Sequence, residues 1–340
     1  MSYSIQKIAE LVGVSVATIS RYFNDSTKVG EETANRIEQV CTQLGYNPKK
    51  YKHRLSRSGS IVGVIVADLS NYFFIDIINA ITDTLNKHKM EVIICNSNES
   101  PENEIRMLNN LSRFTSGIII SPVNESIEYN SEFIENINKT AIPVVLLDRD
   151  TKSGRLSGVF QNSYSGAMQA VKALINNGHK NIAMLSGPIT AKPGLERLSG
   201  YMDCLRLNNI PIVSDYILYS DFLCEPAERM TIKLLSAHPE VTAIFSANNM
   251  MTIGAYRGIK RLGLSVPDDF ALVSYGEILP NLTYDAEGLS VLYQPTREIG
   301  LQCANILLER INNKSKIEKR VTIDSQLILR GTEIYPPNRQ

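Results

Sequence analysis

Residues 5–24 read IQKIAELVGVSVATISRYFN, and this stretch predicts two short helices joined by a tight turn. Two helices cross closely only where small residues meet, and Ala9 supplies that contact. Gly13 supplies the turn, and Ile19 and Tyr22 give the second helix an apolar side. The pattern is typical of a helix-turn-helix, with any other three-helix bundle of these spacings as the alternative.

Residues 1–48 are predicted to form three short helices and no strand. Capping side chains and glycines mark where each helix begins and ends. We expect the helices at about residues 5–12, 15–23 and 31–44, with Ser4 and Ser15 as N-caps and Gly45 as a C-cap.

The pattern changes at Ile61, where the apolar run IVGVIVAD begins. From there, continuous apolar strands alternate with amphipathic helices, which predicts parallel sheets covered by helices on both faces. The alternation pauses near residues 158–162 and then starts again, so we expect two similar lobes. A late strand and a long helix over about 297–312 indicate that the chain crosses between the lobes once more.

Composition excludes several classes of protein. Five widely spaced cysteines and four scattered histidines predict neither a disulfide framework nor a metal site, and no cofactor is expected. No apolar run is long enough to span a bilayer, so we expect a soluble, cytoplasmic protein without membrane contact. The motifs of serine hydrolases, P-loop enzymes and zinc proteases are absent, so we expect no enzymatic activity.

The charge of the chain is balanced overall but not along its length. Lys and Arg number 35, as do Asp and Glu, yet residues 1–60 carry nine basic and five acidic residues, a net +4. The remainder carries 26 basic and 30 acidic residues, a net −4. A basic head on an acidic body indicates that the head binds a polyanion.

The segment KKYKHRLSRSGS, residues 49–60, concentrates much of that positive charge. It contains no acid, and one large aliphatic residue, Leu55, lies in its middle. A solvated linker is the simplest interpretation of such a run. Its position between a helix-turn-helix and an α/β body favours a second interpretation, a hinge that contacts DNA.

Ordered landmarks along nearly the whole chain resemble the LacI/GalR family of bacterial transcription regulators. They are GVSVATISRYFN, KVGEETANRIEQVCTQLGYNP, VADLSNYFF, GIIISP, IPVVLLDR, GHKNIAMLSGP, ERLSGY, FSANNMMTIGAYRGIKRLGLSVPDDFALVSYGE and YQPTREIG. The resemblance implies an all-α helix-turn-helix headpiece and a two-lobed α/β effector domain of the type I periplasmic-binding-protein kind. It also implies a homodimer, and the lack of C-terminal heptads predicts a dimer rather than a tetramer.

The expected domains follow from this resemblance. They are a headpiece at 1–48, a hinge at 49–60 that becomes helical on DNA, and an effector and dimerisation domain at 61–340, with an N-lobe at about 61–161 and 292–320 and a C-lobe at about 162–291 and 321–333.

The resemblance also implies which residues contact DNA. If the second helix enters the major groove, its first residues face base edges, and the apolar Val16 and Ala17 occupy the two main specificity positions. Arg21 is the candidate for a guanine contact, with a phosphate contact as the alternative. Leu55 matches the residue that wedges between central base pairs in the minor groove. The full set is Ser4, Ile5, Ser15, Val16, Ala17, Thr18, Ser20, Arg21, Asn24, Lys28, Val29, Thr33, Tyr46, Lys49, Lys52, Arg54 and Leu55.

Effector-binding residues are expected between the lobes, just after the carboxyl ends of strands. By resemblance these are Phe73, Phe74, Asp148, Arg197, Phe222, Asn248 and Gln294. Carboxylate, amide and guanidinium groups with flat rings suit a hydroxylated ligand. The alternatives are that Asp68 and Asp148 cap strand ends and that Phe73 or Phe74 is core.

One departure concerns the class of ligand. Gly276 takes a place where the family commonly has an acid, and Glu277 follows it. Together with Lys192 and Arg197, this favours an anionic ligand such as a sugar acid or sugar phosphate over a plain sugar. We therefore expect a repressor of carbohydrate or sugar-acid genes that binds a pseudo-palindromic operator. The alternative is a sugar-binding protein without a role in gene control.

Overall fold

The computed structural model describes residues 5–24, 28–44, 61–124, 128–140, 142–278, 288–313 and 317–335. Its contacts separate an N-terminal unit, residues 1–61 with the loop 114–116, from a body that holds the remaining residues up to 340. The N-terminal unit includes the headpiece.

The headpiece is a three-helix unit, as predicted. Its helices are α1 (Ile5–Val12), α2 (Val16–Asn24) and α3 (Glu31–Gln43). Gly13 has a φ of +73°, which a glycine adopts without strain, and its N–H donates to the Ala9 carbonyl at 2.9 Å. Ile8, Ile19 and Ile37 are fully buried, one from each helix, so the three helices share one small core.

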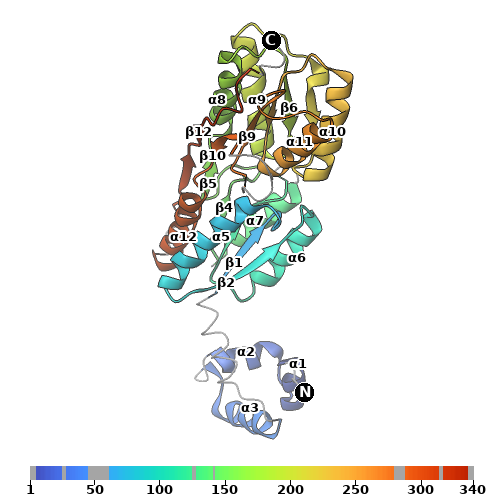
Figure 1. The fold of residues 1–340 in the computed structure, drawn as a ribbon. Coiled ribbons are helices and arrows are strands. Elements are labelled where there is room, and N and C mark those ends of the chain that lie inside the picture. Colours follow the sequence, from blue (N-terminus) through green and yellow to red (C-terminus); the bar gives the residue numbers. More distant parts are fainter. Residues whose placement is uncertain are drawn as a thin grey trace. The chain divides into compact units, whose positions relative to one another are not determined.

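The first half of the body, the N-lobe, is a six-stranded sheet with helices on both faces (Figure 1). The strand order is β11-β5-β4-β3-β1-β2. The strands are β1 (Ile61–Val66), β2 (Glu91–Asn96), β3 (Gly117–Ile120), β4 (Val144–Leu147), β5 (Gly158–Gln161) and β11 (Arg320–Ile323). The helices are α5 (Tyr72–Lys87), α6 (Pro101–Leu111), α7 (Glu128–Asn138) and α12 (Thr296–Asn313).

The second half, the C-lobe, repeats this architecture with the order β12-β10-β9-β8-β6-β7. The strands are β6 (Ile182–Ser186), β7 (Ile217–Tyr219), β8 (Ala243–Ser246), β9 (Ala271–Tyr275), β10 (Ser290–Tyr293) and β12 (Gln326–Ile328). The helices are α8 (Ser163–Asn176), α9 (Lys192–Leu207), α10 (Cys224–Ala237), α11 (Asn249–Arg261) and a 3-10 turn at Ser214–Tyr216.

The chain crosses between the lobes at three places, after β5, after β10 and after β11. The predicted limits are wrong at the last two crossings. Leu292 and Tyr293 belong to the C-lobe strand β10, and residues 321–323 belong to the N-lobe strand β11. A short apolar strand carries no signal of which lobe it joins, because its partners lie far away in the sequence.

The sheets are parallel as predicted, with one exception. Strand β12 pairs antiparallel with β10, while the other strand pairs with a described register are parallel. The reason is the path of the chain. It leaves β11 at the cleft and enters β12 from that side, whereas the other C-lobe strands end there.

Three apolar cores stabilise the body. Strands of the N-lobe pack against α5 and α12 on one face, and against α6 and α7 on the other. A single larger core fills the C-lobe. No helix among the described residues is both long and apolar enough to cross a membrane.

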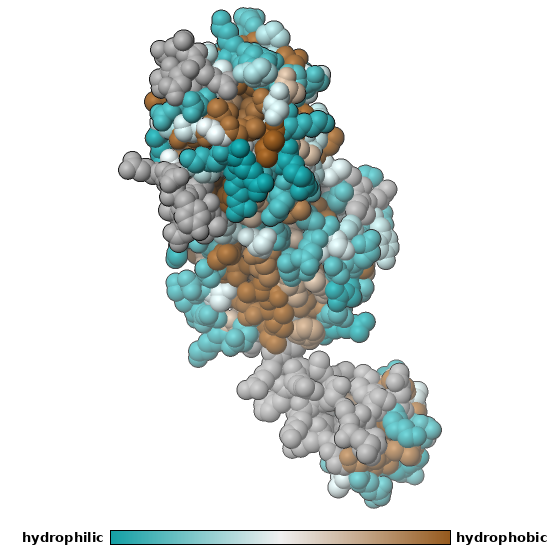
Figure 2. Space-filling model, turned by 45° about the vertical axis from the view of Figure 1, so that its right-hand side comes forward, coloured by the Kyte–Doolittle hydropathy of each residue, from teal (hydrophilic) through white to brown (hydrophobic). Residues whose placement is uncertain are grey.

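Apolar side chains also gather on part of the N-lobe surface, in brown in Figure 2. Ile75 of α5 and Ile94 of β2 are 45% and 44% exposed. Strand β2 is the edge of its sheet as the structure describes it, so its outer backbone groups have no strand partner among the described residues.

Candidate functional site

A cavity of about 370 Å³ lies between the two lobes of the body. All seven residues predicted to bind an effector line it. The full lining is Asp68, Ser70, Asn71, Phe73, Phe74, Asn98, Glu99, Asp148, Arg149, Pro193, Arg197, Asp221, Phe222, Leu223, Asn248, Asn249 and Gln294. These residues come from both lobes, so the cavity exists only where the lobes meet.

Most of these residues lie just after the carboxyl ends of strands or at the first residues of helices. In parallel sheets the carboxyl ends of the strands meet at one edge, and the following helices begin there. Asn71 caps α5 by accepting from the Phe73 N–H, and Asn248 caps α11 by accepting from the Met251 N–H at 2.7 Å. Asn248 therefore has a structural role as well as a place in the cavity wall.

Asp148 is hydrogen-bonded to a pair of glutamines that connects the two lobes. Its Oδ1 accepts from Gln161 Nε2 at 2.8 Å, and Gln161 Oε1 accepts from Gln294 Nε2 at 2.9 Å. The carboxylate is thus oriented by an amide rather than neutralised by a cation. The alternative that Asp148 only caps a strand end does not describe its position fully, since the residue also lines the cavity.

Arg197 is the main donor of the C-lobe wall. It is 4% exposed, its Nη1 donates to the Ala247 carbonyl at 2.6 Å, and its Cζ lies 3.7 Å from the Tyr275 ring centroid. Its buried Nε has no hydrogen-bond partner in the described chain. A buried donor without a partner is costly, so Arg197 is placed at the cavity wall at some expense of stability.

Three phenylalanines form the flat apolar parts of the wall. Phe73 and Phe74 pack edge to face, with ring centroids 5.1 Å apart, and both also belong to the N-lobe core. Phe222 covers Gly187, where a Cβ would come within 2.0 Å of its ring. Each ring therefore faces the cavity and packs against protein at the same time.

Backbone strain is concentrated at this cavity. Six non-glycine residues of the described chain have a positive φ, and four of them line the cavity: Asn98, Glu99, Asp148 and Phe222. Such conformations cost free energy and tend to occur at functional sites. The strain independently marks the cavity as a site.

Sequence reasoning missed a charged pair in the wall. Arg149 is 5% exposed, and its Nη1 and Nη2 each donate to the Glu99 carboxylate at 2.7 Å. The carbonyls of Pro122 and Val123 accept from the same Nη1. Glu99 follows β2 and Arg149 follows β4, so the strand-end rule that selected Asp148 would also have found them.

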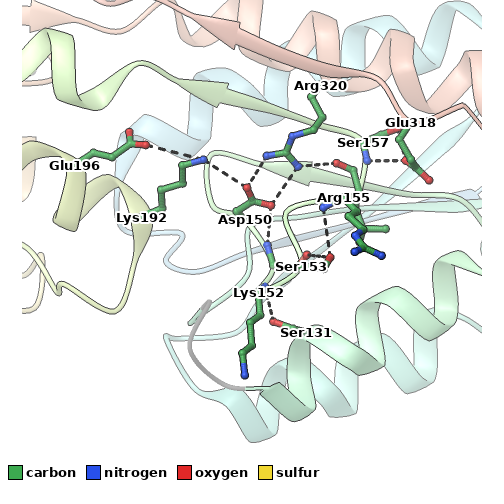
Figure 3. Close-up of polar contacts among 12 residues, drawn as sticks. Ser131, Asp150, Lys152, Ser153, Arg155, Ser157, Lys192, Glu196, Glu318 and Arg320 are labelled. Carbon is green, nitrogen blue, oxygen red and sulfur yellow. Dashed lines mark hydrogen bonds and ion pairs between the residues drawn. The ribbon is translucent and has the colours of Figure 1, made fainter.

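The prediction that Lys192 helps to bind an anion is not supported. Lys192 does not line the cavity; its Nζ lies 3.5 Å from Asp150 Oδ2 and 3.9 Å from Glu196 Oε1 (Figure 3). The wall contains four carboxylates, Asp68, Glu99, Asp148 and Asp221, against two guanidinium groups, and Glu99 already pairs with one of these. The cavity is therefore net acidic.

Gly276 and Glu277 do not supply a carboxylate to the cavity. Gly276 has a φ of +99°, and a Cβ there would come within 2.7 Å of Gln294 Oε1. Glu277 forms two hydrogen bonds with Arg330, at 2.8 and 2.9 Å, and is not part of the cavity wall. Gln294 occupies the space that a longer side chain at 276 would need.

The headpiece presents a second candidate surface on α2. Ser15 accepts from the Thr18 N–H at 3.1 Å and so caps the helix as predicted. Val16 is 46% exposed, and Ala17 and Arg21 are exposed as well, while Ile19 is buried. The helix thus exposes Val16, Ala17 and Arg21, three of the side chains expected to face DNA.

The other predicted DNA contacts divide into two groups. Lys28 is exposed, and Thr18, Val29 and Thr33 are half-buried. The remainder lie outside the described residues or have side chains that are not described: Ser4, Ile5, Ser20, Asn24, Tyr46, Lys49, Lys52, Arg54 and Leu55.

No cluster of His, Cys, Asp and Glu among the described residues has the arrangement of a metal site.

Two family models match the chain. One, described as bacterial regulatory proteins of the lacI family, matches residues 4–49. The other, described as periplasmic binding proteins and the sugar binding domain of the LacI family, matches residues 60–330. Between them they include both candidate surfaces.

Individual relatives agree with the family models. The HTH-type transcriptional repressor PurR of Vibrio parahaemolyticus serotype O3:K6 is 29% identical over 333 residues, 97% of this chain and 98% of the relative. A LacI family regulator from Enterococcus faecium with bound ribose is 25% identical, with a TM-score of 0.69 over 81% of this chain and 99% of the other. The lac repressor dimer bound to operator and the anti-inducer ONPF is 23% identical, with a TM-score of 0.72 over 98% and 100% of the two chains.

Proposed function

The chain belongs to the LacI family of bacterial regulatory proteins, and on that premise we propose that it represses genes of carbohydrate use in response to a small metabolite. The headpiece binds operator DNA, and the cavity between the lobes binds the metabolite. The binding of a metabolite is supported by the cavity wall, where the Arg197 side chain, the oriented Asp148 carboxylate and the strained backbone lie together. The alternative, a sugar-binding protein without gene control, is disfavoured by the match of residues 4–49 to a family of regulators.

We propose an uncharged hydroxylated ligand, in place of the anionic ligand expected from sequence. Arg149 is already committed to Glu99, which leaves Arg197 as the one wall cation not paired with a carboxylate in the described chain. An added anion would meet Asp68, Asp148 and Asp221 in a space where charge is poorly solvated. Sugar hydroxyls can instead donate to these carboxylates, accept from Arg197 and stack on the phenylalanine rings.

We propose a homodimer that uses the apolar surface of the N-lobe. Ile75 and Ile94 expose apolar area beside the edge strand β2, and an edge of this kind invites pairing. A two-fold dimer also matches a pseudo-palindromic operator. Sedimentation velocity measures the state directly, and a tetramer would contradict the proposal.

Both parts of the proposed function, operator binding and the response to a metabolite, are tested by selecting DNA fragments and then titrating the bound fragment with candidate ligands. The full chain is used to select fragments from the chromosome of its source organism, and the retained fragment is titrated at fixed salt with neutral sugars and their matched acids and phosphates. We expect a pseudo-palindromic fragment whose affinity one neutral sugar changes by about 5- to 150-fold. Retention no stronger than that of random DNA would refute the regulator, and a response only to acids or phosphates would refute the uncharged ligand.

A substitution of Leu55 tests the proposed role of the hinge in the same DNA-binding assay. Leu55→Ala removes the proposed minor-groove wedge, so it should weaken binding to the selected fragment more than binding to random DNA. We expect a loss on the order of tenfold or more on the selected fragment, since each lost specific contact amounts to about 1–3 kcal/mol. Equal losses on both DNAs, measured by fluorescence anisotropy, would leave Leu55 as part of a linker.

A further inference from the structure

Asp150 is a buried carboxylate that follows strand β4 and is held by its own lobe (Figure 3). It accepts from Arg320 Nη1 at 3.3 Å and from Arg320 Nη2 at 2.5 Å, and its Oδ1 also accepts from the Thr151 N–H at 2.9 Å. Arg320 in turn lies against the Phe160 ring, with Cζ 4.2 Å from the centroid. All of these groups belong to the N-lobe, so the position of Asp150 does not depend on the other lobe.

Lys192 reaches this carboxylate from the C-lobe. It is the first residue of α9, and its Nζ lies 3.5 Å from Asp150 Oδ2 and 5.3 Å from the Phe160 ring centroid. Glu196, one turn along the same helix, is its second partner at 3.9 Å. A lysine in the first turn opposes the helix macrodipole, so this position costs helix stability unless carboxylates offset it.

The ion pair joins the lobes outside the space for a ligand. Another cross-lobe contact, the hydrogen bond from Asn249 Nδ2 to Asn71 Oδ1 at 3.0 Å, is made by two residues of the cavity wall. Neither Lys192 nor Asp150 lines the cavity. Their contact therefore affects the approach of the lobes without touching a bound molecule.

We propose that Lys192 and Asp150 form a latch that favours the closed arrangement of the lobes and so raises the affinity of the cavity for its effector. This inference rests on the effector role proposed above for the cavity. Opening of the lobes separates Lys192 from Asp150, but Lys192 still pairs with Glu196, and Asp150 still pairs with Arg320. Neither charge is therefore left buried without a partner. The latch therefore shifts a population between open and closed states and is not required for folding.

The latch is tested without ligand or DNA, by hydrogen exchange and mass spectrometry on the full chain. Lys192→Met removes the charge and keeps a chain of similar length against Phe160. Because the Lys192 side chain is 36% exposed, the bias is modest, and we expect exchange to rise about two- to fivefold. The rise should appear in residues 150–152 and also around 72–74 and 249–251, where the lobes meet through Asn71 and Asn249.

Two control variants and a salt titration complete the experiment. Lys192→Arg keeps the charge and should exchange like the unaltered chain, and so should Lys180→Met, which removes an exposed lysine of the same lobe. Raising the ionic strength should speed exchange in the unaltered chain, because salt screens the pair, and should do so less in Lys192→Met.

Exchange that changes only in the first turn of α9, or that is insensitive to salt in the unaltered chain, would overturn the latch. Neither result would bear on DNA binding or on the identity of the effector. A failure of the latch is thus distinguishable from a failure of the proposed function.

Discussion

Removal of residues 1–58 is expected to abolish operator binding and to leave the effector response intact. The headpiece has its own core around Ile8, Ile19 and Ile37, and the body has separate cores in each lobe. The truncated body also has none of the exposed α2 side chains that are proposed to face DNA. We expect the apparent Kd for the selected fragment to rise by on the order of 10³-fold or more, to the level of non-specific binding.

The truncated chain is measured by gel retardation and by thermal unfolding with and without the sugar that acts on the full chain. Its Tm should rise with that sugar as the Tm of the full chain does, since the cavity wall begins at Asp68. A body that folds but no longer responds to the sugar would contradict the modular arrangement.

Arg197→Met is expected to remove the effector response while DNA binding persists. The Arg197 Cζ lies over the Tyr275 ring at 3.7 Å from its centroid, and methionine fills much of the same space without the guanidinium donors. Hydrogen bonds from a charged donor in a buried site contribute about 1.5–3 kcal/mol each, so the affinity for the effector should fall on the order of a hundredfold. Isothermal titration with the active sugar measures this loss directly.

Two further variants separate this role from a general loss of stability. Arg206→Met removes an arginine of the same helix that pairs with Asp203 at the surface, and its affinity should be unchanged. Arg197→Lys keeps a cation but not the planar fork, so it should bind weakly while folding normally. An Arg197→Met chain that binds the sugar as tightly as the unaltered chain would exclude Arg197 from the site.

Much of the candidate site was predictable because it follows from strand ends. Asp148 and Asn248 come directly after apolar strands, and such positions meet at the cleft in any parallel two-lobed fold. The same rule applied to every strand would have added Glu99 and Arg149. The strand-end rule does not show which charged side chains pair with each other. Arg149 is paired with Glu99, so the cavity wall is less cationic than its two arginines suggest.

The preference for an anionic ligand was based on charges whose partners the sequence does not show. Lys192 counts as a positive charge near the site in the sequence, but in the fold it is directed to Asp150 and Glu196. A long flexible side chain can reach partners in several directions, so its sequence position does not determine its contacts. In the sequence, Gly276 stands where relatives commonly have an acid. In the fold, its positive φ and the nearby Gln294 side chain both favour glycine at this position.

The sequence alone determined the helix-turn-helix, the alternation of strands and helices, and the limits of the three headpiece helices and of α12 to within about one residue. These features depend on local periodicity, capping and turn residues, which act over one or two turns of chain. The tertiary structure decided which lobe each late strand joins, the antiparallel course of β12, and the sign of the cavity's charge. Those properties depend on contacts between residues far apart in the chain, such as Lys192 with Asp150, which no local pattern encodes.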